Sequence, residues 1–281
     1  MLYKVLEQKF SPEFDIDEKH WKSNHKAGIS GCFRIRNEEE FLEDAVVSHL
    51  PHLDEVVLAV QPSEDKTLEI ADRLQRYSSK IKVFKYPVAS HFIDHPQFST
   101  DPPNSIYSFV YFSNWALSKC SHQWIAKTEG DVICLPTFSE IVKDVINNPT
   151  TICYYGRYIL NVAGTKCNKI SFQKPRNHGL DEAVFNNNPD LYYFENVGKW
   201  EAIRAHHIKY NGFSALHTKR CKKKYRKGIP GEDWVDFTRE NVGLALSKYN
   251  SKVDRYKGPD NPLGPDCLFV QFDFKQKLKI S

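Results

Sequence analysis

Two carboxylates at the end of an apolar segment are the residues of this chain best suited to chemistry. The segment reads WIAKTEGDV, from Trp124 to Val132, and it contains Glu129 and Asp131. In a strand, side chains two residues apart point to the same face, so these carboxylates would lie side by side. Adjacent carboxylates repel each other unless a cation lies between them, and a divalent ion shared with substrate phosphates would satisfy both. The alternative is a strand that ends in an ordinary turn at Gly130 and Asp131.

The segments around this motif alternate between strand and helix patterns. Short apolar runs predict strands, and apolar residues at helical spacing predict the helices between them. Such alternation is typical of βαβ units and a parallel sheet, which indicates an α/β fold. Ligands of these sheets bind at the carboxyl ends of strands. The expected strands cover 28–35, 55–60, 81–86, 124–132 and 151–162, and the expected helices cover 37–50, 67–77, 105–118 and 138–147.

The expected organisation is one domain with two extensions. Residues 1–26 are polar and predict an N-terminal extension, 27–228 form the main domain, and 229–281 predict a C-terminal extension packed on it. Within the main domain, 88–105 and 164–190 predict loops, the second of them lying over the site. Asn37 is expected to cap the first helix, with three glutamates in its first turn.

Composition excludes several classes of protein. The 281 residues are 41% hydrophobic and 13% aromatic, which is enough for a sizeable core and argues against disorder. The net charge of +4 suits anionic ligands without selecting one. Seven scattered cysteines include no CxxC pair, so we expect reduced thiols and no zinc knuckle, with Cys32, Cys134 and Cys153 in the core.

We expect a soluble protein. No leader-like segment precedes the main domain and no window is apolar enough to span a bilayer, so no transmembrane segment is predicted. The expected location is cytoplasmic, or the host cytoplasm if the source is a virus. A membrane-embedded acceptor would be met at the membrane surface, which leaves peripheral contact open.

Three segments together resemble a family 2-type nucleotide-sugar glycosyltransferase of the GT-A fold. They are ISGCFRIRNEEEFLEDAVVSHLPHLDEVVLAV (29–60), PSEDKTLEIADRL (62–74) and FSNWALSKCSHQWIAKTEGDVICLP (112–136). Their order and spacing agree with that family over residues 27–136, whereas little resemblance extends beyond. The resemblance implies a GT-A-like, Rossmann-related and mostly parallel sheet flanked by helices. It also implies Mn²⁺- or Mg²⁺-dependent transfer of a sugar, with inversion, from a nucleotide-diphosphate sugar to a hydroxyl of a glycan or glycoconjugate acceptor.

The resemblance implies a metal site and departs from the family pattern in two places. Asp131 and Glu129 stand at the family's DxD motif, with glutamate in place of the first aspartate, and Glu129 could instead reach the ribose. Gln61 stands where the family has an aspartate that holds the nucleotide. A histidine commonly completes the family's metal site, and His217 fits, although it could also be a surface or partly buried histidine. The rivals His206 and His207 lie in a polar stretch.

The remaining expected contacts concern the donor and the reaction. Arg34 and Arg36 flank Ile35 at the end of the first strand and are expected, with Gln61, Asn114 and Glu129, to bind the nucleotide sugar. The alternatives are a solvated strand end for the arginines and a helix-surface position for Asn114. Inverting transfer needs a general base, for which Glu201, Asp233 and Glu195 are candidates. The segment around Asp233 also suits an ordinary helix start.

Two other functions stay open at this stage. A sugar-phosphate nucleotidyltransferase on a related fold would need a glycine-rich loop after the first strand, which is absent here. A catalytically decayed binding protein would explain Gln61 and the glutamate at 129. The basic run KRCKKKYRK (219–227) could grip a diphosphate or an anionic acceptor, or form a solvated face. It lacks interleaved aromatics, so we expect no nucleic-acid partner.

Overall fold

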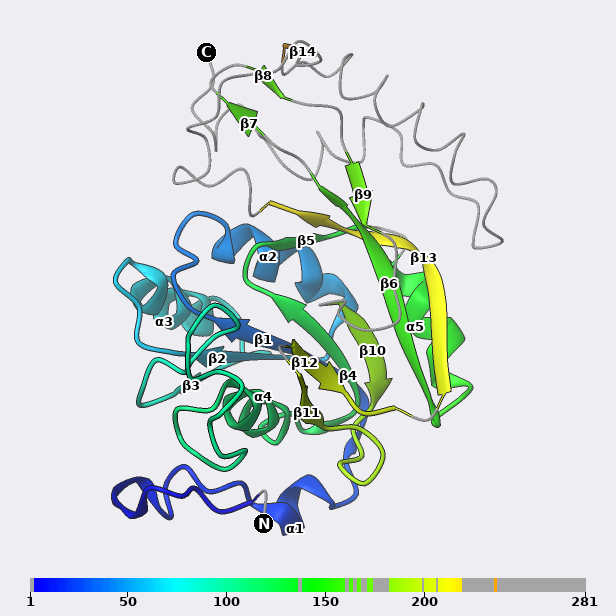
Figure 1. Ribbon diagram of the computed structural model, residues 1–281. Coiled ribbons are helices and arrows are strands. Elements are labelled where there is room, and N and C mark those ends of the chain that lie inside the picture. Colours follow the sequence, from blue (N-terminus) through cyan, green and yellow to red (C-terminus); the bar gives the residue numbers. More distant parts are fainter. Residues whose placement is uncertain are drawn as a thin grey trace.

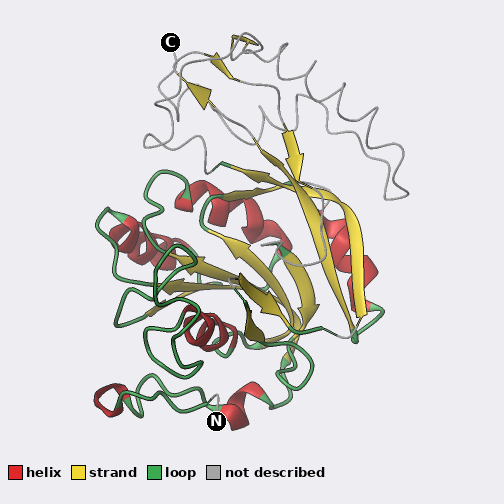
Figure 2. Ribbon diagram, in the orientation of Figure 1, coloured by secondary structure: helices red, strands yellow, loops and turns green. Residues whose placement is uncertain are grey.

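The computed structural model describes residues 3–135, 138–159, 162–163, 166–167, 171–173, 182–198, 200–205, 207–218 and 235–236. Its centre is a large sheet whose first half is parallel throughout, in the order β3 (Ile81–Lys85), β2 (Glu55–Val60), β1 (Lys26–Ile35) and β4 (His122–Glu129). Helices flank this sheet on both faces (Figures 1 and 2). The predicted α/β class, with a mostly parallel sheet between helices, is confirmed.

The second half of the sheet adds strands of both directions. After β4 come β10 (Ala183–Asn186), β6 (Thr151–Ile159), β13 (His207–His217) and β5 (Val132–Cys134). β10 is antiparallel to both of its neighbours, β6 and β13 are parallel, and β13 is antiparallel to β5. β9 (Ser171–Gln173) pairs with β6. Two smaller sheets contain β11 (Phe194–Val197) with β12 (Trp200–Ile203), and β7 (Val162–Ala163) with β8 (Lys166–Cys167) and β14 (Val235–Asp236).

Alternation along the central strands builds two apolar layers. Phe33 of β1 and Leu58 of β2 pack with α2 (Leu42–His49) and α3 (Thr67–Tyr77). Cys32 and Val57, which point the opposite way, pack with α4 (Phe109–Leu117). Figure 1 shows α2 and α3 on one side of the sheet and α4 on the other. The other helices are η1 (Gln8–Phe10), α1 (Glu18–Trp21), η2 (Leu50–His52) and α5 (Phe138–Ile146).

The N-terminal segment belongs to the layer around α4. Val5, Ile16 and Trp21 are buried there, and the Trp21 indole Nε1 donates a hydrogen bond to Oδ1 of Asn187 at 3.0 Å. The expected boundary at residue 26 stays a prediction. The expected C-terminal extension lies outside the described residues, apart from 235–236. Among the helices that the structure describes, none has the length and apolarity that a bilayer span requires.

Two sequence-based expectations about local structure are wrong. The first helix begins only at Leu42, and the backbone amides of Glu38 and Glu39 donate to the side chains of Thr67, at the start of α3, and Asp65, in the loop before it. Asn37 has a φ of 58° and accepts from the Glu64 amide, so it does not cap that helix. The predicted loop 164–190 contains the short strands β8, β9 and β10, and β10 pairs with β4 on one side and β6 on the other.

Cysteine burial agrees with the expected core. Cys32, Cys120, Cys134 and Cys153 are free thiols and buried. Burial raises the pKa of the Cys134 thiol well above its usual range, which keeps it protonated and unreactive at neutral pH.

Acid should destabilise the protein through His49. This side chain is 1% exposed, and its Nδ1 donates to the Ala45 carbonyl at 2.8 Å. Burial lowers its pKa to about 4. The unfolded chain therefore takes up a proton as the pH falls below about 6.5, whereas the folded chain does so only near 4. The contribution of His49 to the free energy of unfolding is therefore intact above about pH 6.5 and falls by up to about 3 kcal/mol as the pH drops to about 4.

Urea unfolding at pH 7.5 and pH 4.5 measures this loss. In His49→Leu the difference in unfolding free energy between the two pH values should shrink by about that amount. An equal pH dependence in the variant and the parent would contradict the prediction.

Candidate active site

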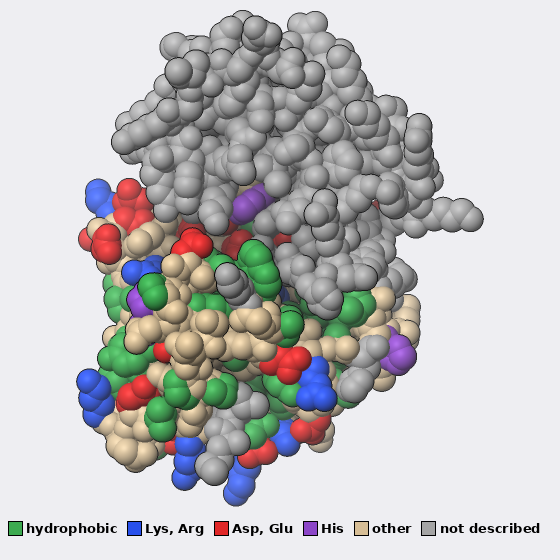
Figure 3. All heavy atoms as spheres, in the orientation of Figure 1, with side chains coloured by type: hydrophobic (Ala, Val, Ile, Leu, Met, Phe, Trp, Pro, Cys, Tyr) green, Lys and Arg blue, Asp and Glu red, His purple; other side chains and the backbone are tan. Residues whose placement is uncertain are grey.

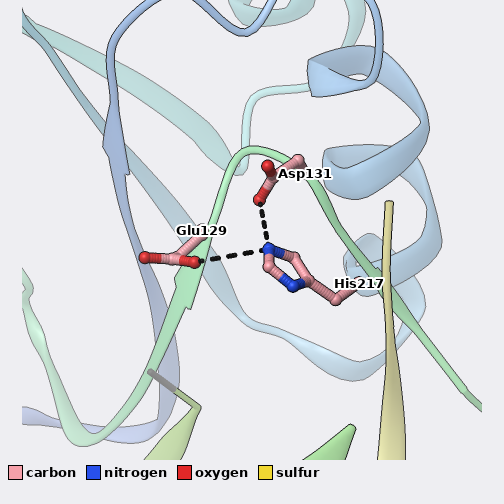
Figure 4. A group of neighbouring side chains, drawn as sticks. All are labelled: Glu129, Asp131 and His217. Atoms are coloured by element: carbon pink, nitrogen blue, oxygen red, sulfur yellow. Dashed lines mark ion pairs between the residues drawn. The ribbon is translucent and has the colours of Figure 1, made fainter. Parts of the chain in front are cut away.

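Three side chains meet at the end of β4 (Figure 4). Nε2 of His217 lies 3.5 Å from Oδ1 of Asp131 and 4.0 Å from Oε2 of Glu129. One ligand-type atom from each residue lies within 4.8 Å of the others. The structure thus brings together the three residues predicted as metal ligands, although they are far apart in the sequence.

Strand pairing places these residues. Glu129 ends β4, the chain turns at Gly130, and Asp131 precedes β5. β13 runs antiparallel to β5, with His217 opposite Val132. The next residue, Thr218, donates from its backbone amide and its hydroxyl to the Asp131 carbonyl, at 2.9 and 2.7 Å. The backbone of the turn and the end of β13 are therefore joined directly.

Gly130 allows a close contact at this turn. A Cβ added there would lie 2.8 Å from Cγ of Glu38, which reaches over the turn from the loop after β1. Any side chain at 130 would push Glu38 away or shift the turn that carries both carboxylates. Glycine between the two acids is thus explained by packing as well as by turn formation.

The cluster fits a divalent cation. His217 is 7% exposed, and its Nε2 has no hydrogen-bond partner in the described part of the chain. Leaving a buried nitrogen without a partner costs free energy, which a ligand at this position would recover. Carboxylates with one imidazole suit Mn²⁺. An octahedral ion with ligands at about 2.1 Å separates adjacent ligand atoms by about 3 Å and opposite ones by about 4 Å, close to the spacing observed.

Arg34 and Glu201 form a buried ion pair beside this cluster. Arg34 Nη1 lies 2.5 Å from Oε1 of Glu201 and 2.6 Å from Oγ of Ser113, whose hydroxyl also lies 3.0 Å from Oε2 of Glu201. The guanidinium carbon lies within 5 Å of the ring centroids of Phe109 and Phe194. Arg34 is the strand partner of Glu129, so the pair lies next to the candidate metal ligands.

The other expected donor contacts have different surroundings. Gln61 is buried after β2, and its Oε1 accepts from the amide and hydroxyl of Ser90 at 2.7 and 3.0 Å. Asn114 is buried on α4 and exchanges two hydrogen bonds with the backbone of Phe194, at 2.9 and 2.7 Å. Asn114 therefore joins α4 to β11, and we do not propose that it contacts the nucleotide sugar. Arg36 is exposed just beyond β1.

Some of the remaining candidate site residues lie in the part of the chain that the structure describes, and others lie outside it. His207 begins β13 and is exposed, at the opposite end of that strand from His217. Glu195 is half-exposed on β11. His206, Asp233 and the basic run 219–227 lie outside the described residues.

Sequence analysis missed several residues at this site. Lys127 is 2% exposed in β4, two residues before Glu129, and its Nζ lies 5.8 Å from the Phe194 ring. A lysine within an apolar run was the available signal. Ser113, Glu38 and Thr218 had no signal in the sequence, because their partners are distant along the chain.

Comparisons with known proteins found structural overlaps but no family to which the chain can be assigned. No protein-family model matches the chain, and no curated protein matches its sequence. S. aureus TarS (residues 1–349) overlaps with a TM-score of 0.42 and 12% identity, over 83% of this chain and 67% of that one.

Two further solved structures overlap to a similar degree. Glucosyl-3-phosphoglycerate synthase from Mycobacterium tuberculosis, in complex with Mn²⁺, UDP-glucose and phosphoglyceric acid, overlaps with a TM-score of 0.40 and 12% sequence identity. The overlap covers 86% of this chain and 84% of that one. GalNAc-T7 with UDP, GalNAc and Mn²⁺ overlaps with a TM-score of 0.42 and 10% sequence identity, over 91% of this chain and 56% of that one. At these scores and identities the overlap carries no argument about activity.

Glu201→Gln should destabilise the protein. The substitution keeps the shape of the side chain but removes the counter-charge of Arg34, whose side chain is 5% exposed. Breaking a buried pair in this way typically costs about 3 kcal/mol or more. Urea unfolding measures the change.

Glu43→Gln is the matched control, because Glu43 pairs with Arg73 at 2.7 Å with both side chains about half exposed. There the loss should stay below about 1 kcal/mol. Equal, small losses in both variants would show that Glu201 does not hold the fold at this point.

Proposed function

We propose that this protein is a metal-dependent glycosyltransferase of the GT-A type. It would transfer a sugar from a nucleotide-diphosphate sugar to a hydroxyl of a glycan or glycoconjugate acceptor, with inversion. The observation that carries the proposal is the group of Glu129, Asp131 and His217, with the buried Nε2 of His217 facing the two carboxylates. The three sequence segments in register, from the first strand to the Glu-Gly-Asp motif, support it.

Asp131, Glu129 and His217 would hold Mn²⁺ or Mg²⁺. A bound divalent ion supplies neutralisation of the negative charge that develops on a departing diphosphate. The chain positions these ligands with little freedom, because Thr218 and the β13–β5 pairing fix the turn. Preorganised ligands avoid the cost of assembling the site during the reaction.

Arg36 is the proposed cationic contact to the donor. It is exposed at the carboxyl edge of the sheet, whereas Arg34 is engaged with Glu201 and Ser113. Gln61 would act from the end of β2, with its amide oriented by Ser90. Arginine suits this position because its planar group matches phosphate oxygens.

The proposed general base is Glu201 or Asp233. Glu201 lies beside the candidate metal ligands, and each of its oxygens already has a partner in Arg34 or Ser113. A carboxylate oxygen has a second lone pair that can accept the acceptor's proton. Glu195, the third candidate from the sequence, lies on the opposite face of the hairpin from Glu201, so we do not propose it as the base.

The loop after β1 argues against nucleotidyl transfer. Gly28 and Gly31 lie inside β1, and the following residues are Arg36, Asn37 and the acidic run 38–40. Acidic side chains in place of a glycine-rich loop do not form a cradle for a triphosphate.

Manganese should stabilise the folded protein. At a concentration 100 times the dissociation constant, binding to the folded state alone adds about 2.7 kcal/mol. Asp131→Asn and His217→Ala should lose this stabilisation while still unfolding cooperatively without metal. Asp72→Asn, at an exposed carboxylate paired with Lys85, should keep it. Thermal unfolding with and without Mn²⁺ measures all four proteins, and an unchanged response in Asp131→Asn would contradict the site.

A panel of nucleotide-diphosphate sugars tests the reaction. We expect metal-dependent release of nucleoside diphosphate from at least one donor, reduced about 100-fold or more in Asp131→Asn. Manganese binding without nucleotide binding or turnover would instead indicate a decayed enzyme. Release of pyrophosphate from a nucleoside triphosphate and a sugar phosphate would indicate nucleotidyl transfer.

A further inference from the structure

The β11–β12 hairpin has two faces of different character. Phe194, Glu201 and Ile203 point inward, and each is buried or nearly so. The opposite face carries three cross-strand pairs, because side chains alternate along each strand. These pairs are Tyr193 with Arg204, Glu195 with Ala202, and Val197 with Trp200.

The inner face is attached firmly to the main sheet and to α4. The Arg34–Glu201 ion pair and the two hydrogen bonds between Asn114 and the Phe194 backbone make this attachment. Arg34 is also the strand partner of Glu129. The hairpin is therefore a rigid element next to the candidate reaction centre.

The outer face exposes a large aromatic side chain. Trp200 is 60% exposed and Val197, directly opposite, is 46% exposed. Of the other tryptophans in the described part of the chain, Trp21, Trp115 and Trp124 are at most 6% exposed. Trp200 and Val197 lie side by side, so together they form a small exposed apolar patch that is accessible to a ligand.

Polar groups lie along the same face. Arg204 is hydrogen-bonded to the Tyr193 hydroxyl and lies over that ring, with its guanidinium carbon 5.6 Å from the centroid. Glu195 stands between this pair and Trp200. From Tyr193 to Val197 the strand extends about 13 Å, so the face presents an aromatic group at each end, with Arg204 at the Tyr193 end and Glu195 between them. Figure 3 shows hydrophobic and charged side chains mixed on the side of the molecule that carries this hairpin.

We propose that this outer face is a carbohydrate-binding subsite, which would seat a neutral oligosaccharide acceptor. The inference rests on the proposed transferase function for its role. Sugar rings present apolar C–H faces that pack on aromatic rings, and hydroxyls that bond to carboxylate and guanidinium groups. The one acid and one base along the face cancel, which suits a neutral chain better than an anionic membrane or a polyphosphate.

The test uses the full chain with Mn²⁺ and three neutral probes: maltotetraose, cellotetraose and chitotetraose. Binding is measured by calorimetry, and the part of the acrylamide quenching of tryptophan fluorescence that is absent from Trp200→Phe reports on Trp200. At least one probe should bind and reduce the quenching. Trp200→Ala should weaken binding about tenfold or more, and Trp200→Phe, which keeps a ring, should stay within about threefold.

Tyr77→Ala is the matched control, because Tyr77 is a 70% exposed aromatic on α3, outside the hairpin. It should bind the probes as the parent does. The proposal is overturned if no probe binds, if Trp200→Ala binds normally, or if vesicles of anionic lipid protect Trp200 when the oligosaccharides do not.

Nucleotide binding separates this proposal from the function it rests on. Trp200→Ala should bind Mn²⁺ and nucleoside diphosphates as the parent does, since its side chain points away from Glu201. Loss of oligosaccharide binding alone supports the subsite. Absence of nucleotide binding in both proteins, with Trp200-dependent oligosaccharide binding intact, would refute the transferase and leave the subsite.

Discussion

The antiparallel pairing of β13 with β5 is the constraint on which the candidate site depends. It sets His217 opposite Val132 and lets Thr218 hold the Asp131 carbonyl twice. A shift of one residue in this pairing would turn the imidazole to the other face of the strand. The cluster therefore exists only while the second half of the sheet is in register.

Buried charge is the second organising feature. Arg34 and Lys127 lie under the β11–β12 hairpin, which contributes Glu201 to the ion pair and the Phe194 ring that lies near both cations. Burying charges is costly unless they are paired, so the hairpin, α4 and β1 must remain together. We infer that this pairing specifies the position of the hairpin more than it adds stability.

The two loops beside the site support each other. Backbone amides of 37–39 bond to side chains of 63–67, and Glu38 rests on Gly130. The turn that carries the two carboxylates is thereby packed against the first βαβ unit. The parallel half of the sheet thus positions the acids, and the mixed half delivers the histidine.

Local sequence patterns were enough to place several elements and to identify the chemistry of one motif. Helix α3 matches its expected range, and the paired acids were visible because residues two apart share a face of a strand. His217 was found through a family resemblance, whereas β10 was missed because four residues are too few to show a period.

Which distant groups became partners followed from the assembled sheet. Arg34 and Glu201 are 167 residues apart, and Asn114 and Phe194 are 80 apart. Residue types at such separations do not reveal which side chains are in contact, because the contacts depend on strand order and register across the whole sheet. That is why the sequence predicted both residues of the Arg34–Glu201 pair as separate functional groups and could not predict the bond between them.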